Sequence, residues 1–230
     1  MCEICAKEYK EVLTTNAFLL PVNIEKAISS NRKAYAIAIR QELFERETTE
    51  LSQRLLAGDI TIESWQKEMK IKLKELYISG AATGKGGWNE LSPRDFGRMG
   101  TPLKEQYKYL SRYAKYISEN RDTISLRYMQ NRNALYSQVM AIAAIEAEAG
   151  FYFKDNLPYL PKDGKSECLN RCHCKWVLEI TGTEGLFSIV KCVWNISEVE
   201  HCKTCISRNN YSLILKVPID VEVPLQIGGY

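Results

Sequence analysis

Residues 167–205 read ECLNRCHCKWVLEITGTEGLFSIVKCVWNISEVEHCKTC, and they contain six of the eight cysteines of the protein and both of its histidines. Two short cysteine clusters lie at the ends of this stretch, Cys168-x3-Cys172-x-Cys174 and Cys202-x2-Cys205. The residues between them are rich in β-branched and aromatic types, which favour strands. Structural zinc sites use four ligands in a tetrahedron, and two cysteine loops at the ends of a hairpin can supply them. We therefore expect this stretch to form a small β module that is held together by zinc.

The pattern leaves the ligand set partly open. Spacing favours four thiol ligands, which are Cys168, Cys172, Cys202 and Cys205. Other sulfur and imidazole groups can replace one of these or add a second pair: Cys174, His173, His201, and the N-terminal Cys2 and Cys5. Inert buried thiols and disulfides are the alternatives. Clustering in a cytoplasmic chain favours a metal over disulfides.

Composition sets broad limits on the protein class. The chain has 230 residues, with 45% hydrophobic and 26% charged side chains and a formal net charge of +3. This length suits one large domain or two small ones, and the charge is too small to identify the whole chain as a nucleic-acid binder. Residues 1–20 lack a basic start followed by an apolar block, and no apolar run is long enough to span a bilayer. We expect a chain that is made in a cytoplasm and has no membrane partner.

Apolar residues recur near the helical period through most of the first 150 positions. They predict helices over 22–57, 61–78, 103–120 and 125–149. Residues 80–102 carry six glycines and are interpreted as a flexible joint within the helical domain, or a surface that adapts to a neighbour. They are not a phosphate loop, because Gly84-Lys85-Gly86 lacks the required Ser or Thr. Within them, Ser92-Pro93 followed by Asp95 is typical of a helix start.

The helix predicted over 103–120 has one basic side, which we regard as a candidate interaction surface. It consists of Lys104, Lys108, Arg112 and Lys115. Tyrosines lie among these residues. The side is a solvated face in the simplest interpretation, and contact with DNA phosphates or with an acidic protein remains open.

The period changes after Phe151. Residues 176–180 and 187–194 predict a hairpin around a turn at 181–185, and 211–217 predict a further strand. The tail alternates apolar side chains, which are Ile219, Val221, Val223, Leu225 and Ile227. Pro218 and Pro224 exclude a central strand, so the tail suits an edge strand or an arm on a neighbouring subunit. The predicted class is α+β: an N-terminal arm (1–21), a helical domain (22–150), a Cys-rich zinc-ribbon-like β module (151–217) and a C-terminal β arm (218–230).

Catalytic patterns are missing from the sequence. Both histidines adjoin cysteines of the expected metal module, which argues against a Ser-His-Asp or Cys-His arrangement. A zinc-knuckle endonuclease would need further histidines outside the knuckles, and a zinc-ribbon DNA-binding protein would need more basic residues inside the module. We expect a protein that is not an enzyme, with the DNA-binding ribbon and then the nuclease as alternatives.

Several strings resemble a known family. They are GKGGWNELSPRDFGRMG, LKEQYKYLSRYAKYI, RNALYSQV, LPYLPKDGKSECLNRCHCKW and VWNISEVEHCKTC. Together they are similar to the minor head, or head-morphogenesis-like, structural proteins of tailed bacteriophages, over roughly residues 50–210. The family's cysteine positions then correspond to Cys168, Cys172, Cys174, Cys202 and Cys205.

The resemblance implies a virion component. Such a protein would assemble in several copies, as a homo-oligomer, with capsid, portal or neck proteins of the phage particle. It would carry no chemistry of its own, and the resemblance transfers no catalytic residues.

Overall fold

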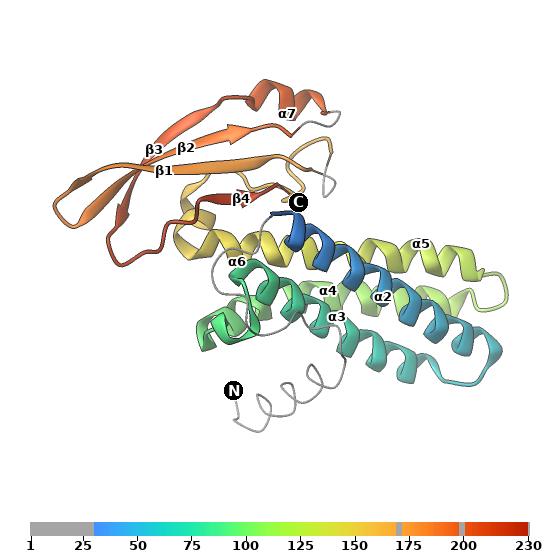
Figure 1. Cartoon of the computed structure of the whole chain (residues 1–230). Coiled ribbons are helices and arrows are strands. Elements are labelled where there is room, and N and C mark those ends of the chain that lie inside the picture. Colours follow the sequence, from blue (N-terminus) through green and yellow to red (C-terminus); the bar gives the residue numbers. More distant parts are fainter. Residues whose placement is uncertain (1–29, 169–171, 198–200, 230) are drawn as a thin grey trace.

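The computed structural model describes residues 30–168, 172–197 and 201–229. A bundle of long helices is followed by a small antiparallel sheet, which lies across one end of the bundle (Figure 1). This arrangement confirms the predicted α+β class with its cysteine cluster near the C-terminal sheet. The predicted N-terminal arm at 1–21, with Cys2 and Cys5, lies outside the described residues.

The helices occupy most of the first 156 positions. In chain order they are α2 (Ser30–Ala57), α3 (Ile62–Lys85), the short 3-10 helix η1 (Trp88–Glu90), α4 (Pro93–Glu119), α5 (Leu126–Ser137), α6 (Val139–Asn156) and, after the hairpin, α7 (Lys203–Arg208). The strands are β1 (Lys175–Glu184), β2 (Phe187–Asn195), β3 (Ser212–Pro218) and β4 (Gln226–Gly228).

Helix α4 begins at Pro93, directly after the Ser92 cap that the sequence predicted as a helix start, and it includes the helix predicted over 103–120. The Ser92 hydroxyl accepts a hydrogen bond from the Asp95 amide, and the Asp95 carboxylate accepts one from the Ser92 amide at 2.9 Å. This capping box satisfies backbone donors that would otherwise be unpaired at the helix end. It starts the helix ten positions before the predicted boundary, so Gly97, Gly100 and Pro102 lie inside α4.

The glycine-rich segment 80–102 is therefore mostly helical and differs from the predicted flexible joint. Its first residues continue α3, and their glycines face α6. A Cβ on Gly80 would lie 2.4 Å from the Met140 carbonyl oxygen, and one on Gly84 would lie 2.0 Å from that of Ala144. Glycines four positions apart share one helix face, so these two let the helix backbones approach closely. Only residues 86–92, which include η1, connect α3 to α4 outside a long helix.

The sheet has the strand order β3-β2-β1-β4, and all its pairs are antiparallel. Trp176 of β1 lies opposite Trp194 of β2, and both side chains are fully buried with Tyr159 against them. These rings join the same continuous cluster of buried side chains as the helices. The hairpin is longer than predicted, since the strands continue through 181–184 and the chain turns at Gly185–Leu186.

The C-terminal segment only partly follows the predicted alternating arm. Residues 219–225 form no strand, and Gln226–Gly228 pair with Lys175–Val177 as the short edge strand β4 of the same chain. Ile227 is buried, whereas Ile219 and Leu225 are exposed and Val221 and Val223 are half-buried. The chain turns after Pro218, so successive apolar side chains do not all lie on one face. The alternation of apolar residues in the sequence predicted a strand here, because it carries no information about these turns.

Within the described ranges, none of the helices combines the length and the apolar character that crossing a bilayer requires.

Candidate metal centre

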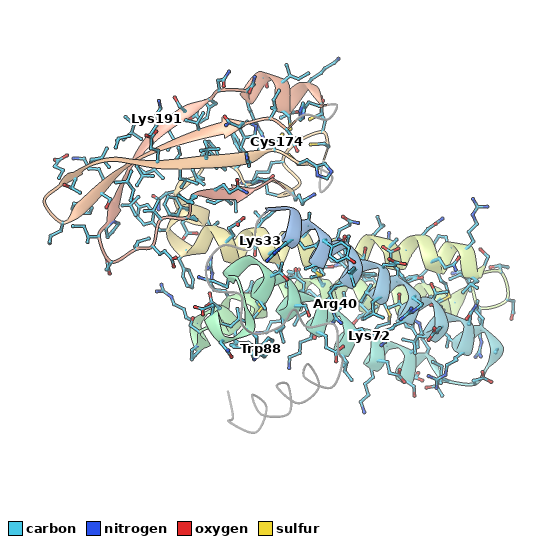
Figure 2. All side chains as sticks on the ribbon, in the orientation of Figure 1. Lys33, Arg40, Lys72, Trp88, Cys174 and Lys191 are labelled. Atoms are coloured by element: carbon cyan, nitrogen blue, oxygen red, sulfur yellow. The ribbon has the colours of Figure 1, made fainter. Side chains whose placement is uncertain are left out.

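Three backbone segments bring the cysteines of residues 168–205 to one end of the sheet. The loop after α6 carries Cys168, the residues just before β1 include Cys172 and Cys174, and the start of α7 carries Cys202 and Cys205. Figure 2 shows the labelled Cys174 at the end of the sheet beside α7, with yellow sulfur atoms next to it.

The loop that carries Cys168 is fixed by its own hydrogen bonds. The Asp163 carboxylate accepts the amides of Leu160 and Lys165, both at 2.9 Å, and the Trp176 indole donates to the Tyr159 carbonyl at 2.9 Å. Asx-type turns of this kind set the direction of a short loop without regular secondary structure. The loop therefore delivers Cys168 to the buried end of the hairpin.

The sulfur atoms lie at distances that suit one tetrahedral ion. The Cys205 Sγ lies 3.6 Å from the Cys168 Sγ and 3.8 Å from the Cys172 Sγ, and all three atoms lie within 4.8 Å of one another. Four sulfurs bound to zinc at about 2.3 Å would be separated by about 3.8 Å, the edge of that tetrahedron. The three thiols of Cys168, Cys172 and Cys205 could therefore hold a metal ion together.

Cys202 lies next to this group. The Cys205 amide donates to the Cys202 Sγ at 3.4 Å, which also caps α7. Although burial works in the opposite direction, hydrogen bonds from the amides and thiols of Cys205 and Cys168 lower the pKa of Cys202 to about 7. The Cys202 sulfur thus contacts Cys205 and Cys168, and its lowered pKa favours the thiolate form that binds metals.

The other thiols divide into those that ionise readily and those that keep their proton. Hydrogen bonds, first of all from the Cys174 thiol, lower the pKa of Cys172 to about 5 against the opposing effect of burial. Burial is the first cause that raises the pKa of Cys168 and of Cys205. Because a metal binds thiolates, an ion that enters this cluster must displace protons from Cys168 and Cys205.

Cys174 lies beside the group, where it contacts Cys172, Cys205 and His201. The Cys174 Sγ lies 3.8 Å from His201 Nδ1, and His201 Nε2 lies 2.6 Å from the Ser197 carbonyl oxygen. A carbonyl only accepts, so Nε2 carries the proton and Nδ1 is left as an acceptor. Cys174 has a single thiol proton for its two acceptors, Nδ1 and the Cys172 sulfur, and donation to Cys172 is the first cause that raises the pKa of Cys174. Cys174 therefore keeps its proton and supports the site as a hydrogen-bond donor.

The remaining predicted ligand, His173, is exposed and is not in the group of atoms that could share an ion. Sequence reasoning missed two neighbours of the group. Ser166 Oγ lies 3.2 Å from the Cys168 Sγ, and Lys162 is buried beside Cys168 and Cys172. Burial lowers the pKa of Lys162, and the two cysteines oppose this shift. A lysine in a loop before the first cysteine carries no sequence signal, because only folding places it there.

The predicted basic side of residues 103–120 lies on the outer surface of α4. All four of its residues, Lys104, Lys108, Arg112 and Lys115, are exposed. Lys108 pairs with Glu105 at 2.6 Å and Lys115 with Glu119 at 3.7 Å, so acids of the same helix neutralise part of the charge. The structure brings these four residues together on one face but far from the cysteine group (Figure 1).

Comparison of the chain with protein-family models, with curated proteins and with solved structures gives no match in any of the three cases. The geometry of the cysteine group and the sequence patterns are therefore the features that support a function for this chain.

Proposed function

We propose that this protein is a structural component of a tailed-phage virion, in which a zinc ion holds the C-terminal β module in shape. The observation that carries the proposal is the spacing of the Cys168, Cys172 and Cys205 sulfurs at 3.6–3.8 Å around Cys205. A site made of thiolates alone is the structural type of zinc site, since no coordination position stays open for a substrate.

The identity of the metal follows from the donor atoms. Thiolate ligands select soft or borderline ions, and tetrahedral sulfur coordination is typical of zinc. The proposed ligands are Cys168, Cys172, Cys202 and Cys205. Cys202 is preferred to Cys174 because Cys174 already has a partner in His201, whereas Cys202 accepts amide hydrogen bonds that stabilise a thiolate.

A metal is useful in this position because the proposed ligands lie outside the strands of the sheet. They come from the loop after α6, the segment just before β1 and the start of α7, and no strand pairing among the described residues joins these three segments to one another. Metal ligation in such a small module contributes directly to folding. The ion would fix the end of the sheet against the helical body.

The role in a virion rests on the resemblance of the sequence strings to minor head proteins. The most specific of these strings form the junction of α3 with α4 and the three segments that carry the cysteines. The partners proposed are capsid, portal or neck proteins and further copies of the chain, and no catalytic role is assigned.

Two measurements test this function. Elemental analysis of the purified full-length protein is expected to find about one zinc per chain. Mass spectrometry of purified phage particles from the genome that encodes the chain is expected to detect it as a virion protein. A zinc-free protein would remove the structural rationale, and its absence from particles would remove the virion role. Cleavage of plasmid DNA, or salt-dependent binding to duplex DNA, would favour the nuclease or the DNA-binding ribbon instead.

A further inference from the structure

Lys162 lies in the loop between α6 and Cys168, and the protein encloses its side chain. The residue is 7% exposed, and no other lysine or arginine in the described ranges is buried to this extent. Charged side chains are rarely buried unless an opposite charge accompanies them, because burial removes the water that solvates the charge. The burial of this lysine therefore indicates a negatively charged neighbour.

The backbone of Lys162 is also strained. Residues 160–163 form a turn in which the Asp163 amide donates to the Leu160 carbonyl at 3.4 Å. Proline in the second position and a positive φ in the third are typical of a type II turn, whose third residue is usually glycine or asparagine. Lys162 occupies that third position, after Pro161, with a φ of 61°. A side chain in this left-handed region costs about 1–2 kcal/mol, so the preference of the turn does not explain the lysine.

Contacts on both sides of the turn hold Lys162 in place. The Asp163 carboxylate accepts a hydrogen bond from the Leu160 amide at 2.9 Å and closes the turn. Strand β4 packs closely on the turn, since a Cβ on Gly228 would lie 2.6 Å from the Pro161 Cγ. The fold therefore keeps a strained and buried lysine at a fixed place beside the cysteine group.

The charged neighbours of Lys162 include two proposed metal ligands. Burial lowers the pKa of Lys162, and Cys172 and then Cys168 oppose this shift because their negative charge stabilises the ammonium. A divalent ion with four thiolate ligands carries a net negative charge. Much of that charge would be buried here, since Cys172 and Cys205 are 3% and 1% exposed. A buried net charge is costly, and an opposite charge close to it offsets part of the cost.

We propose that Lys162 is the charge-compensating residue of the metal centre. Its ammonium balances part of the negative charge of the four thiolates and thereby increases the affinity of the site for zinc. This inference rests on the proposed zinc site and deepens it, because it adds a residue that acts on the metal through its ligands. Groups outside the ligand set that support the ligands in this way commonly change metal affinity about 10–100-fold.

The test measures the zinc affinity of full-length variants by competition with a chromophoric chelator. Lys162→Met removes the charge and keeps most of the length of the side chain, so it is expected to bind zinc about 10–100-fold more weakly than wild type. Lys162→Arg keeps the charge and is expected to recover most of the affinity. Lys165→Met removes an exposed lysine of the same loop and is the matched control, which should bind zinc like wild type.

Lys162→Gly separates the charge from the shape of the turn. Glycine adopts a positive φ without strain, so a residue that served only the turn could be replaced by glycine with no loss of zinc affinity. The charge role predicts that Lys162→Gly binds zinc as weakly as Lys162→Met. At saturating cobalt(II), Lys162→Met should keep the visible absorption bands of the wild-type protein, because all four thiolates remain.

Four results would overturn the role of Lys162. They are wild-type zinc affinity in Lys162→Met, wild-type affinity in Lys162→Gly, equal weakness of Lys162→Arg and Lys162→Met, and changed cobalt bands in Lys162→Met. Wild-type protein that binds no zinc would instead overturn the proposed metal centre itself. The failure of this inference is therefore distinguishable from the failure of the proposed function.

Discussion

The Sγ atoms of Cys168 and Cys205 lie 3.6 Å apart although 37 positions separate the two residues in the chain. The loop after α6 therefore meets the first turn of α7, and a metal ion between the two sulfurs would connect both to the segment just before β1 through Cys172.

Cys205→Ser is expected to reduce the zinc content from about one ion per chain to nearly none, because Cys205 is the sulfur that the other two share. Elemental analysis after gel filtration measures the zinc content of the variant. Cys192 is the matched control: it is buried in β2, and no contact joins its sulfur to the group in the described structure. Cys192→Ala should keep its zinc while losing about 1 kcal/mol of stability. Retention of zinc by Cys205→Ser would contradict the assigned site.

The fourth ligand can be assigned by cobalt substitution. Cobalt(II) reports tetrahedral thiolate coordination through its visible absorption, and fewer thiolates weaken and shift the bands. Cys202→Ser is expected to change the spectrum and lower the affinity, because Cys202 contacts Cys205 and Cys168. Cys174→Ser should have the same cobalt spectrum as the wild-type protein, since Cys174 is paired with His201. The reverse result would make Cys174 the ligand.

Removal of the metal is expected to loosen the β module and to leave most of the helical body folded. Trp176 and Trp194 are buried close to the cysteine group, so their fluorescence should shift to longer wavelength when a chelator removes the ion. Far-ultraviolet circular dichroism should keep most of its helical signal, because most of the buried side chains of the continuous core come from α2–α6 and pack against one another. Added zinc should restore the fluorescence. An unchanged tryptophan spectrum in protein shown to be metal-free would argue against a structural ion.

Gly84→Ala is expected to destabilise the protein by about 1–3 kcal/mol, as overpacking does in close helix contacts. The reason is that the new Cβ would lie 2.0 Å from the backbone carbonyl of Ala144, which cannot move aside as a side-chain tip can. Gly97→Ala supplies the control within α4, where a Cβ meets nothing within 4 Å. That variant should gain up to about 1 kcal/mol from helix propensity. Urea denaturation of both variants measures the difference, and equal effects would rule out close packing of α3 on α6.

Tyr113→Phe is expected to make the protein less sensitive to alkali. Burial raises the pKa of Tyr113 above the usual tyrosine value of about 10, and its hydroxyl has no hydrogen-bond partner in the described structure. Below pH 10 the residue is protonated in both states, and its contribution to stability is complete. Above pH 10 the unfolded chain ionises while the folded one keeps the proton, so stability falls with rising pH.

The measurement is the free energy of unfolding as a function of pH. The Phe variant should lose less stability than wild type between neutral and strongly alkaline pH, and at neutral pH it should be as stable or up to about 1 kcal/mol more stable. Parallel pH profiles for the two proteins would show that Tyr113 does not titrate with unfolding.

Local chemistry in the sequence predicted many of the elements. The Ser92 cap, the apolar periods of α3 and α4 and the β-branched hairpin are all decided by residues within a few positions of one another. The thiols that group in space, Cys168, Cys172 and Cys205, are among those that spacing favoured as ligands. The sequence could not show that Gly80 and Gly84 continue a helix. These glycines allow close packing against α6, which lies sixty positions later in the chain.

The sequence by itself determined the α+β class, the starts of α3 and α5, the Ser92 cap of α4 and the two cysteine loops, since capping, periodicity and ligand spacing act over a few residues. It did not show that the helix predicted over 125–149 is divided into α5 and α6, or that α6 continues past Gly150 to Asn156. Only the tertiary structure decided which sulfurs meet, where Lys162 lies, why Gly80 and Gly84 are needed, and that the end of the chain becomes β4 of its own sheet. These features depend on packing between segments far apart in the chain, and the spacing of residues along one segment carries no information about the surface it will meet.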